Sequence, residues 1–244
     1  MSSELDRDLA QLLEEAKQRT SVDKIWARKS SHFESKLTGM KALRLGGAYS
    51  PLFVGGTASE GEGWGNADWP AVAGGTRIPF AKILYVDLIP DAPEMRILDQ
   101  WVPVLETAAK SKTNFVVVTP RFESSVLLSM LIVNRVHNKL NCAALKRGEL
   151  TEEAVVFLKQ CADSALLSVK SASSSSKGSK QGESSSVFGE VWLRAEESVA
   201  IPGVSGGIPE HLLEEITVLE VGGKSLPDIR DRMQLVSKVI SGWR

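Results

Sequence analysis

Apolar and polar residues alternate along the middle of the chain in blocks that predict strands separated by helices. Three short apolar runs predict strands, at residues 82–88, 114–120 and 140–146, and the second of them is rich in β-branched residues. Between and after them, apolar residues recur at helical spacing over residues 97–110 and 151–162. This order predicts an α/β fold, with right-handed crossovers and a parallel core sheet.

Single residues refine the ends of these two helices. Pro103 predicts that the first helix starts near Asp99, because proline is tolerated only in the first turn of a helix. Thr151 immediately precedes the second helix, and its hydroxyl is a suitable N-cap.

The segment from 120 to 140 predicts a further helix, with an excess of apolar residues. Between Val126 and Val133, seven of eight residues are apolar, and Ser129 is the exception. A helix packed on a sheet needs one apolar stripe about 100° wide, whereas these residues point in every direction. Leu127 and Leu131 are the candidates for the side that packs on the sheet. A second covering surface is therefore expected for this helix.

The chain ends predict more helices, and one hairpin lies between them. Apolar spacing predicts helices over residues 3–18, 209–220 and 227–241. Residues 190–203 predict a β-hairpin that turns at Glu196 and Glu197.

Three segments predict connections. Residues 19–45 are moderately basic and favour a solvated connector. Residues 54–79 are rich in glycine and contain Trp64 and Trp69, which favours a long loop that docks on another surface. Residues 171–186 are mostly serine, so we expect a disordered, solvated loop there.

Composition excludes some classes of protein. The 244 residues are 43% hydrophobic, with a net charge of −1, which is ordinary for a globular protein and gives no general signature of nucleic-acid binding. No apolar run reaches the roughly 18 residues of a membrane span. The N-terminal segment resembles neither a secretory signal nor an Arg-rich transit peptide.

Few residues suggest catalysis or ligand binding. A phosphate loop and a dinucleotide fingerprint are missing, and the turn after residues 82–88 contains no glycine. His32, His137 and His211 are neither at metal-ligand spacing nor beside a plausible nucleophile. Asp87 and Asp91 follow a strand, where a turn and a helix-initiating acid are the simpler interpretation. We therefore expect no enzyme activity, no cofactor and no metal site.

The central blocks resemble a known family. Residues 102–106 (Val-Pro-Val-Leu-Glu), 131–134 (Leu-Ile-Val-Asn) and 143–146 (Ala-Ala-Leu-Lys) resemble, in order and spacing, the apical domain of group I chaperonins. Residues 46–53 resemble that domain's Ser-Pro loop, and residues 188–203 its closing hairpin. Residues 1–41 and 209–244 resemble, more loosely, a helical intermediate domain flanking an apical-like region at 42–208.

This resemblance implies a function. In the family, two helices and the Ser-Pro loop present apolar side chains to polypeptide. The matching positions here are apolar: Leu52, Phe53, Val102, Leu105, Leu128, Ile132 and Val133. They would form a polypeptide-binding groove, unless the chain's own Trp64/Trp69 loop covers them.

Departures from the family change that expectation. The equatorial ATPase domain has no counterpart, so an ATP-driven folding cycle is not expected of this polypeptide. We expect a scaffold subunit or assembly factor that binds a dedicated protein partner, in a mitochondrion or other organelle of endosymbiotic origin. The alternatives are a free, ATP-independent holdase and a structural subunit of an organellar ribonucleoprotein; the latter rests on the basic residues between 24 and 44.

Overall fold

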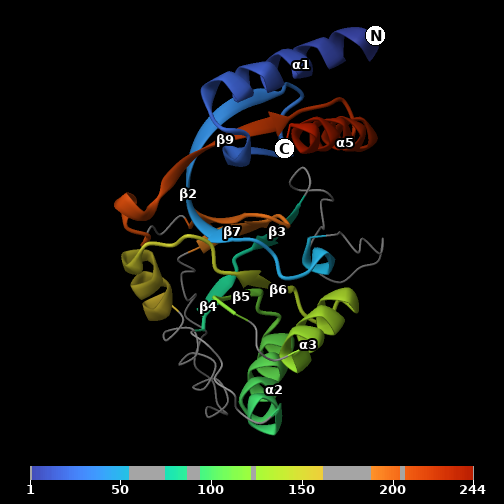
Figure 1. Cartoon of the computed structure of the whole chain (residues 1–244). Helices are drawn as coiled ribbons and strands as arrows, with labels where there is room; N and C mark the ends of the chain where they lie inside the picture. The colour runs from blue at the N-terminus through green and yellow to red at the C-terminus, as the bar shows by residue number, and fades with distance from the viewer. Residues whose placement is uncertain are drawn as a thin grey trace, which may run out of the picture.

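The protein is a layered arrangement of two sheets and their helices (Figure 1). The computed structural model describes residues 2–54, 75–86, 94–121, 125–161, 188–203 and 207–243. Residues 55–74 of the predicted long loop, with Trp64 and Trp69, lie outside these ranges, as do Asp87, Asp91 and the serine tract at 171–186. The end of that predicted loop is not a loop, because Thr76–Pro79 forms a strand.

The predicted parallel core is confirmed. Strands β4 (Lys82–Tyr85), β5 (Phe115–Thr119) and β6 (Cys142–Lys146) form a three-stranded parallel sheet in that order. The first residues after these strands lie along one edge of the sheet, because parallel strands end on the same side. The mixed α/β class that the alternation predicted is therefore the class of the fold.

Helices α2 (Glu94–Ser111) and α3 (Ser125–Val136) lie on one side of this sheet (Figure 1). The predicted start of α2 near Asp99 is wrong, because Pro103 lies inside the helix. An interior proline costs about 3 kcal/mol or more. Trp101, Leu105 and Ala108 all bury their side chains in the core, and this packing offsets that cost.

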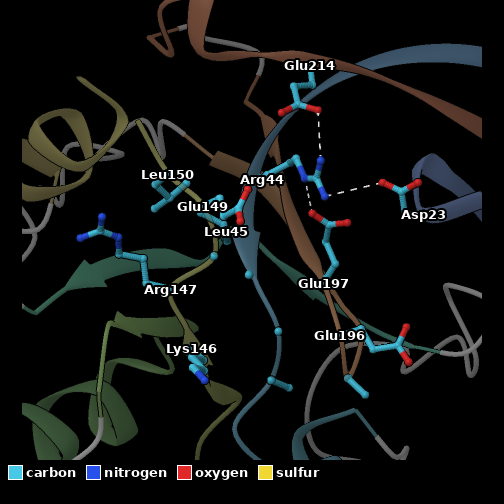
Figure 2. Close-up of a pocket in the computed structure, with 15 residues that line it drawn as sticks. Asp23, Arg44, Leu45, Lys146, Arg147, Glu149, Leu150, Glu196, Glu197 and Glu214 are labelled. Carbon is cyan, nitrogen blue, oxygen red and sulfur yellow. Dashed lines mark hydrogen bonds and ion pairs between the residues drawn. The ribbon is translucent and has the colours of Figure 1, made fainter. Parts of the chain in front are cut away.

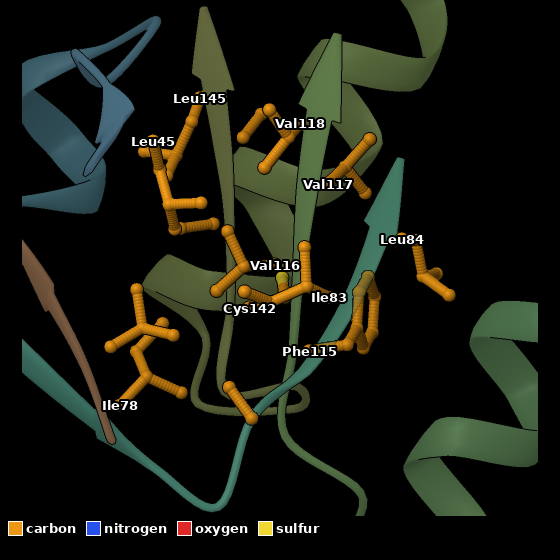
Figure 3. Close-up of a cluster of buried hydrophobic side chains, with 14 of the residues drawn as sticks. Leu45, Ile78, Ile83, Leu84, Phe115, Val116, Val117, Val118, Cys142 and Leu145 are labelled. Carbon is orange, nitrogen blue, oxygen red and sulfur yellow. The ribbon is translucent and has the colours of Figure 1, made fainter. Parts of the chain in front are cut away.

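A second sheet covers the other side. Strands β3 (Thr76–Pro79), β7 (Phe188–Leu193) and β8 (Ser198–Pro202) belong to a six-stranded sheet of order β1-β9-β2-β8-β7-β3. The hairpin β7–β8 turns between Leu193 and Ser198, as predicted. Figure 3 shows Leu45 and Ile78 from this sheet beside Val116 and Leu145 of the parallel sheet, where the largest core lies.

The expected connector at 19–45 is wrong. It contains η1 (Val22–Lys24) and two strands of the larger sheet, β1 (Ile25–Lys29) and β2 (Lys36–Gly46). The helix predicted over 209–220 is also wrong, because this segment forms η3 (Glu210–Leu212) and strand β9 (Glu214–Val221). Strand β9 lies between β1 and β2, and this position favours its β-branched residues over the helical alternative.

The terminal helices are as predicted. α1 (Ser2–Arg19) and α5 (Leu226–Gly242) pack over β1 and β9 around a second core, which includes Leu9, Leu13, Met233 and Val236. The two terminal segments thus share one core. They are not wholly helical, since β1, part of β2 and β9 belong to them.

A helix over residues 152–161 follows β6, and its predicted cap is confirmed. The Thr151 hydroxyl accepts a hydrogen bond from the backbone N–H of Ala154 at 3.2 Å. The Ser-Pro segment forms a short helix, η2 (Pro51–Phe53), which packs against α3.

Candidate functional site

The apolar excess on α3 is explained by neighbours on several sides. Leu127 and Leu131, which the sequence assigned to the sheet side, are fully buried. Leu128, Met130 and Ile132 are half-buried and pack against the same core. Because α2 and η2 both contact α3, apolar side chains on the flanks of this helix are also covered.

The seven predicted polypeptide-binding residues fall into three groups. Leu52 and Val133 are exposed, with relative accessibilities of 47% and 53%. Val102, Leu128 and Ile132 are half-buried. Phe53 and Leu105 are buried in the main core.

The prediction that Phe53 and Leu105 face a partner is therefore corrected. Both residues stand on elements that the structure brings beside α3, but their side chains point inward. In η2, the Ser50 side chain accepts a hydrogen bond from the backbone N–H of Leu52, and this turn places Leu52 outward while Phe53 is buried.

A shallow depression of about 370 Å³ lies on the outer side of α3. We call it the α3 surface, and its lining residues are Ser125, Val126, Ser129, Met130, Val133 and Asn134. Val126 and Met130 were missed from the sequence. The spacing of Ser125 and Ser129 was a usable signal for this surface. The two serines lie four residues apart and mark the solvent side of the helix, and Val133, four residues further on, lies on the same side.

A larger cavity, of about 880 Å³, lies where the hairpin turn, β2 and the end of β6 meet (Figure 2). Arg44 is one of the residues that line this cavity, and three acidic residues surround it. The guanidinium is hydrogen-bonded to Glu197 and lies 3.6 Å from carboxylate oxygens of both Asp23 and Glu214. The hydrogen bond that Arg44 donates to the Glu197 carboxylate is the main reason that the pKa of Arg44 is raised.

This charged network ties separate elements together. Asp23 lies in η1, Arg44 in β2, Glu197 in the β7–β8 turn and Glu214 at the start of β9. A hydrogen bond from Ser21 is the largest influence on the pKa of Asp23, which is lowered. The mutual pairing of these groups is a structural arrangement, and it places no nucleophile beside a base.

The backbone at the floor of this cavity requires glycine at one position. Gly46 has φ of 113°, and a Cβ there would lie 2.0 Å from the carbonyl oxygen of Lys146. The close crossing of β2 and β6 therefore depends on the absence of a side chain.

The basic stretch between 24 and 44 is largely neutralised by carboxylates. Lys24 lies 2.9 Å from Glu214, and Lys36 lies 3.3 Å from Glu220. The remaining pairs are Arg28 with Glu220, Lys41 with Glu210, and Arg44 with its three acids. This pairing weakens the electrostatic argument for nucleic-acid binding through these residues.

Groups with catalytic potential are scattered in the described part of the chain. His32, His137 and His211 are exposed on separate elements, and His211 pairs with Glu153 at 3.2 Å. Burial raises the pKa of the Cys142 thiol to about 12, so this thiol is not a reactive nucleophile. No cluster of three or more potential metal ligands occurs among the described residues.

Comparison with protein families finds no match, and comparison with curated protein sequences finds none either. Within the described ranges, every helix is too short or too polar to cross a membrane.

Proposed function

We propose that this chain is a chaperonin-derived, non-ATPase protein that binds a polypeptide partner through the α3 surface and Leu52. One observation carries the proposal. Val133 and Leu52 remain exposed on adjacent elements, although the core of α3 is already complete with Leu127 and Leu131. Fold stability therefore gives no reason for apolar residues at these two positions.

The order of elements supports the resemblance to a chaperonin apical domain. A β4-α2-β5-α3-β6 unit is followed by an antiparallel hairpin, and the Ser-Pro turn packs beside α3. These are the elements in which the resembling motifs occur. The same ancestry favours a mitochondrion or another organelle of endosymbiotic origin.

A dedicated partner is preferred over promiscuous holding of unfolded chains. The exposed apolar area is small, since five of the seven resembling positions are half-buried or buried. A shallow surface suits one complementary partner that buries Leu52 and Val133, each worth roughly 1.5–3 kcal/mol when fully desolvated. The alternatives remain a free holdase and a subunit of an organellar ribonucleoprotein.

Val133→Glu and Leu52→Glu test the proposal, with Leu235→Glu on α5 as the matched control. Leu235 is 42% exposed, so all three substitutions place a carboxylate on an exposed apolar position. Each should change the free energy of unfolding by less than about 0.5 kcal/mol in urea denaturation.

Binding then separates the variants. Tagged protein purified from its own cells should retain one stoichiometric protein partner, and Val133→Glu and Leu52→Glu should weaken this complex at least tenfold, measured by titrating the recovered partner. Leu235→Glu should not. Suppression of aggregation of an unfolded, alkylated protein by the unmodified chain would instead favour the holdase. Equal binding by all three variants would refute a role for the α3 surface.

A further inference from the structure

The six-stranded sheet spans two regions of the molecule, and β2 is the strand that they share. Residues 36–42 of β2 pair with β9, and residues 43–46 pair with β8. We call residues 2–42 and 214–243, which include α1, β1, β9 and α5, the terminal region; residues 43–203 form the central region. Figure 1 shows α1 and α5 at the opposite end of the molecule from α2 and α3. Side-chain contacts beside β2 therefore decide whether the two regions move as one body.

Two fully buried tryptophans meet where these regions join. Trp26 of β1 belongs to the terminal region and Trp192 of β7 to the central region, and their ring centroids lie 5.8 Å apart. The ring planes are tilted by 51°, and the separation lies in the range of favourable aromatic pairs. The core around them draws on both regions: Met40, Ala42, Ile216 and Val218 from the terminal region, and Val199 and Ile201 from the central region.

Strand β7 connects this contact to the main core. Successive side chains of a strand point to opposite faces of its sheet. Val191 and Leu193 accordingly pack in the main core, whereas Trp192 between them packs against Trp26. A displacement of the terminal region would therefore disturb a strand of the main core.

Arg194, which directly follows β7, contacts β1 in two ways. Its guanidinium carbon lies 3.7 Å from the centroid of the Trp26 ring, and its Nη2 donates a hydrogen bond to the backbone carbonyl oxygen of Ile25 at 2.8 Å. Arg194 is only 3% exposed, and Trp26 is fully buried. The attraction between a cation and an aromatic face is strongest where both are removed from water. One side chain of the central region thus holds both a ring and a backbone group of the terminal region.

The β7–β8 hairpin fixes the position of Arg194. The Ser198 hydroxyl is buried and accepts a hydrogen bond from the backbone N–H of Arg194 at 3.3 Å. In the same hairpin, Trp192 is the cross-strand partner of Val199. The two residues of the central region that contact Trp26 are therefore held in register with each other, and less conformational freedom is lost when they make that contact.

We propose that Trp26, Trp192 and Arg194, which we call the junction cluster, make the terminal and central regions open only together. The Arg44 network also crosses between the regions, but the side chains of Arg44 and Asp23 are 37% and 47% exposed, and water weakens such ion pairs. The junction cluster is enclosed. Its separation would expose two large rings and would remove the donor from the carbonyl of the buried residue Ile25. The cluster therefore dominates the coupling between the regions.

This coupling makes α1 and α5 a rigid support for the central region, because neither helix can detach with its strands while the main core stays closed. The proposal uses no residue of the α3 surface. It therefore stands or falls independently of the proposed function.

Native-state hydrogen exchange in low concentrations of guanidinium chloride measures the opening of each region in the intact chain. The reporters are the slowest amides of β9, in the terminal region, and of β5, in the central region, because each of these strands lies between two neighbours. In the unmodified protein, both sets should show the same opening equilibrium within about a factor of two, and the same dependence on denaturant.

Arg194→Met removes the cation and the hydrogen-bond donor but keeps an unbranched apolar side chain. It should increase the opening of β9 relative to β5 by about tenfold or more. Arg77→Met is the matched control, because Arg77 pairs with Glu190 and both residues belong to the central region. It should change the ratio by less than about twofold. If Arg194→Met does not fold, Trp26→Phe keeps an aromatic ring at the junction and should raise the same ratio by a smaller factor.

Two results would overturn the proposal. Faster opening of β9 than of β5 in the unmodified protein would show that the terminal region already opens by itself. An unchanged ratio in Arg194→Met, with β9 and β5 accelerated equally, would show that this residue stabilises the whole fold without coupling its two regions. A ratio that Arg77→Met raises as much as Arg194→Met does would likewise exclude a specific role for the junction cluster.

Discussion

Helices α3 and α5 both pack on a sheet, but they differ in how many of their sides other elements cover. α5 buries one stripe, Ile229, Met233, Val236 and Ile240. Its exposed side carries polar residues such as Arg230, Asp231 and Lys238, together with Leu226 and Leu235. α3 buries Leu127 and Leu131, half-buries apolar residues on both flanks and still exposes Val133. A helix with one covering surface needs one stripe, whereas a helix surrounded by α2, η2 and the sheet accommodates apolar residues in most directions.

The regions around the two helices differ in the same sense. The strands near α5 are joined by charged pairs, with Glu220 of β9 between Arg28 of β1 and Lys36 of β2. Exposed apolar groups occur in both regions: Leu52 and Val133 lie at α3, and Phe33, Leu226 and Leu235 belong to the terminal region. What differs is the arrangement: at α3 the exposed groups lie on two adjacent elements, η2 and α3.

The largest expected effect comes from truncating the inward residue of each helix. Leu131→Ala and Met233→Ala should each lower the free energy of unfolding by about 2–5 kcal/mol, because both side chains are fully enclosed. Val133→Ala and Leu235→Ala should each change it by less than about 0.5 kcal/mol. Urea denaturation measures all four. A loss from Val133→Ala as large as that from Leu131→Ala would mean that α3 has no free outer side, and the comparison would fail.

A smaller effect on the free energy of unfolding is expected for Glu220 in the terminal region, and this effect should depend on pH. Burial acts to raise the pKa of Glu220, but hydrogen bonds and charges from Arg28 and Lys36 together outweigh it and hold this pKa below its ordinary value. The stabilisation is therefore fully present above the unfolded pKa of about 4.3 and is lost as pH falls through the folded pKa.

Glu220→Gln should lower the free energy of unfolding by about 1 kcal/mol at pH 7, since both cationic partners are partly exposed. The difference between variant and unmodified protein should vanish toward acid pH. Glu106→Gln, which removes an exposed i,i+4 pair on α2, is the control and should show almost no pH-dependent difference. A difference for Glu220→Gln that persists below the folded pKa would contradict this assignment.

The smallest expected effect is a gain in stability at Phe80. This residue is 72% exposed and has φ of 47°, a left-handed conformation that costs an L-residue roughly 1–2 kcal/mol. Phe80→Asn should raise the free energy of unfolding by about 0.5–1 kcal/mol, because asparagine adopts this conformation more readily. Thermal denaturation measures the gain.

Phe33→Asn provides the control, because Phe33 is 75% exposed without a positive φ. It should give no comparable gain. Destabilisation by Phe80→Asn would mean that the exposed ring contributes to the fold, and the expected gain from relieving the left-handed backbone would be refuted.

Much of the fold was predictable because its signals are local. Short apolar runs identified β4, β5 and β6, helical spacing identified α1 and α5, and Thr151 marked a cap that the structure confirms. The inward side of α3 was also predictable, since Leu127 and Leu131 are one turn apart. None of these inferences requires knowledge of a distant partner.

Tertiary structure decided the rest, because it depends on residues that are far apart in the sequence. β1 pairs with β9 through partners such as Ile25 and Thr217, so neither segment shows by itself that it is a strand. Packing on the core likewise let α2 continue through Pro103, and it turned Phe53 and Leu105 inward while leaving Leu52 and Val133 exposed. The sequence determines which residues are apolar. Whether each apolar residue is buried or exposed depends on which elements pack around it in the tertiary structure.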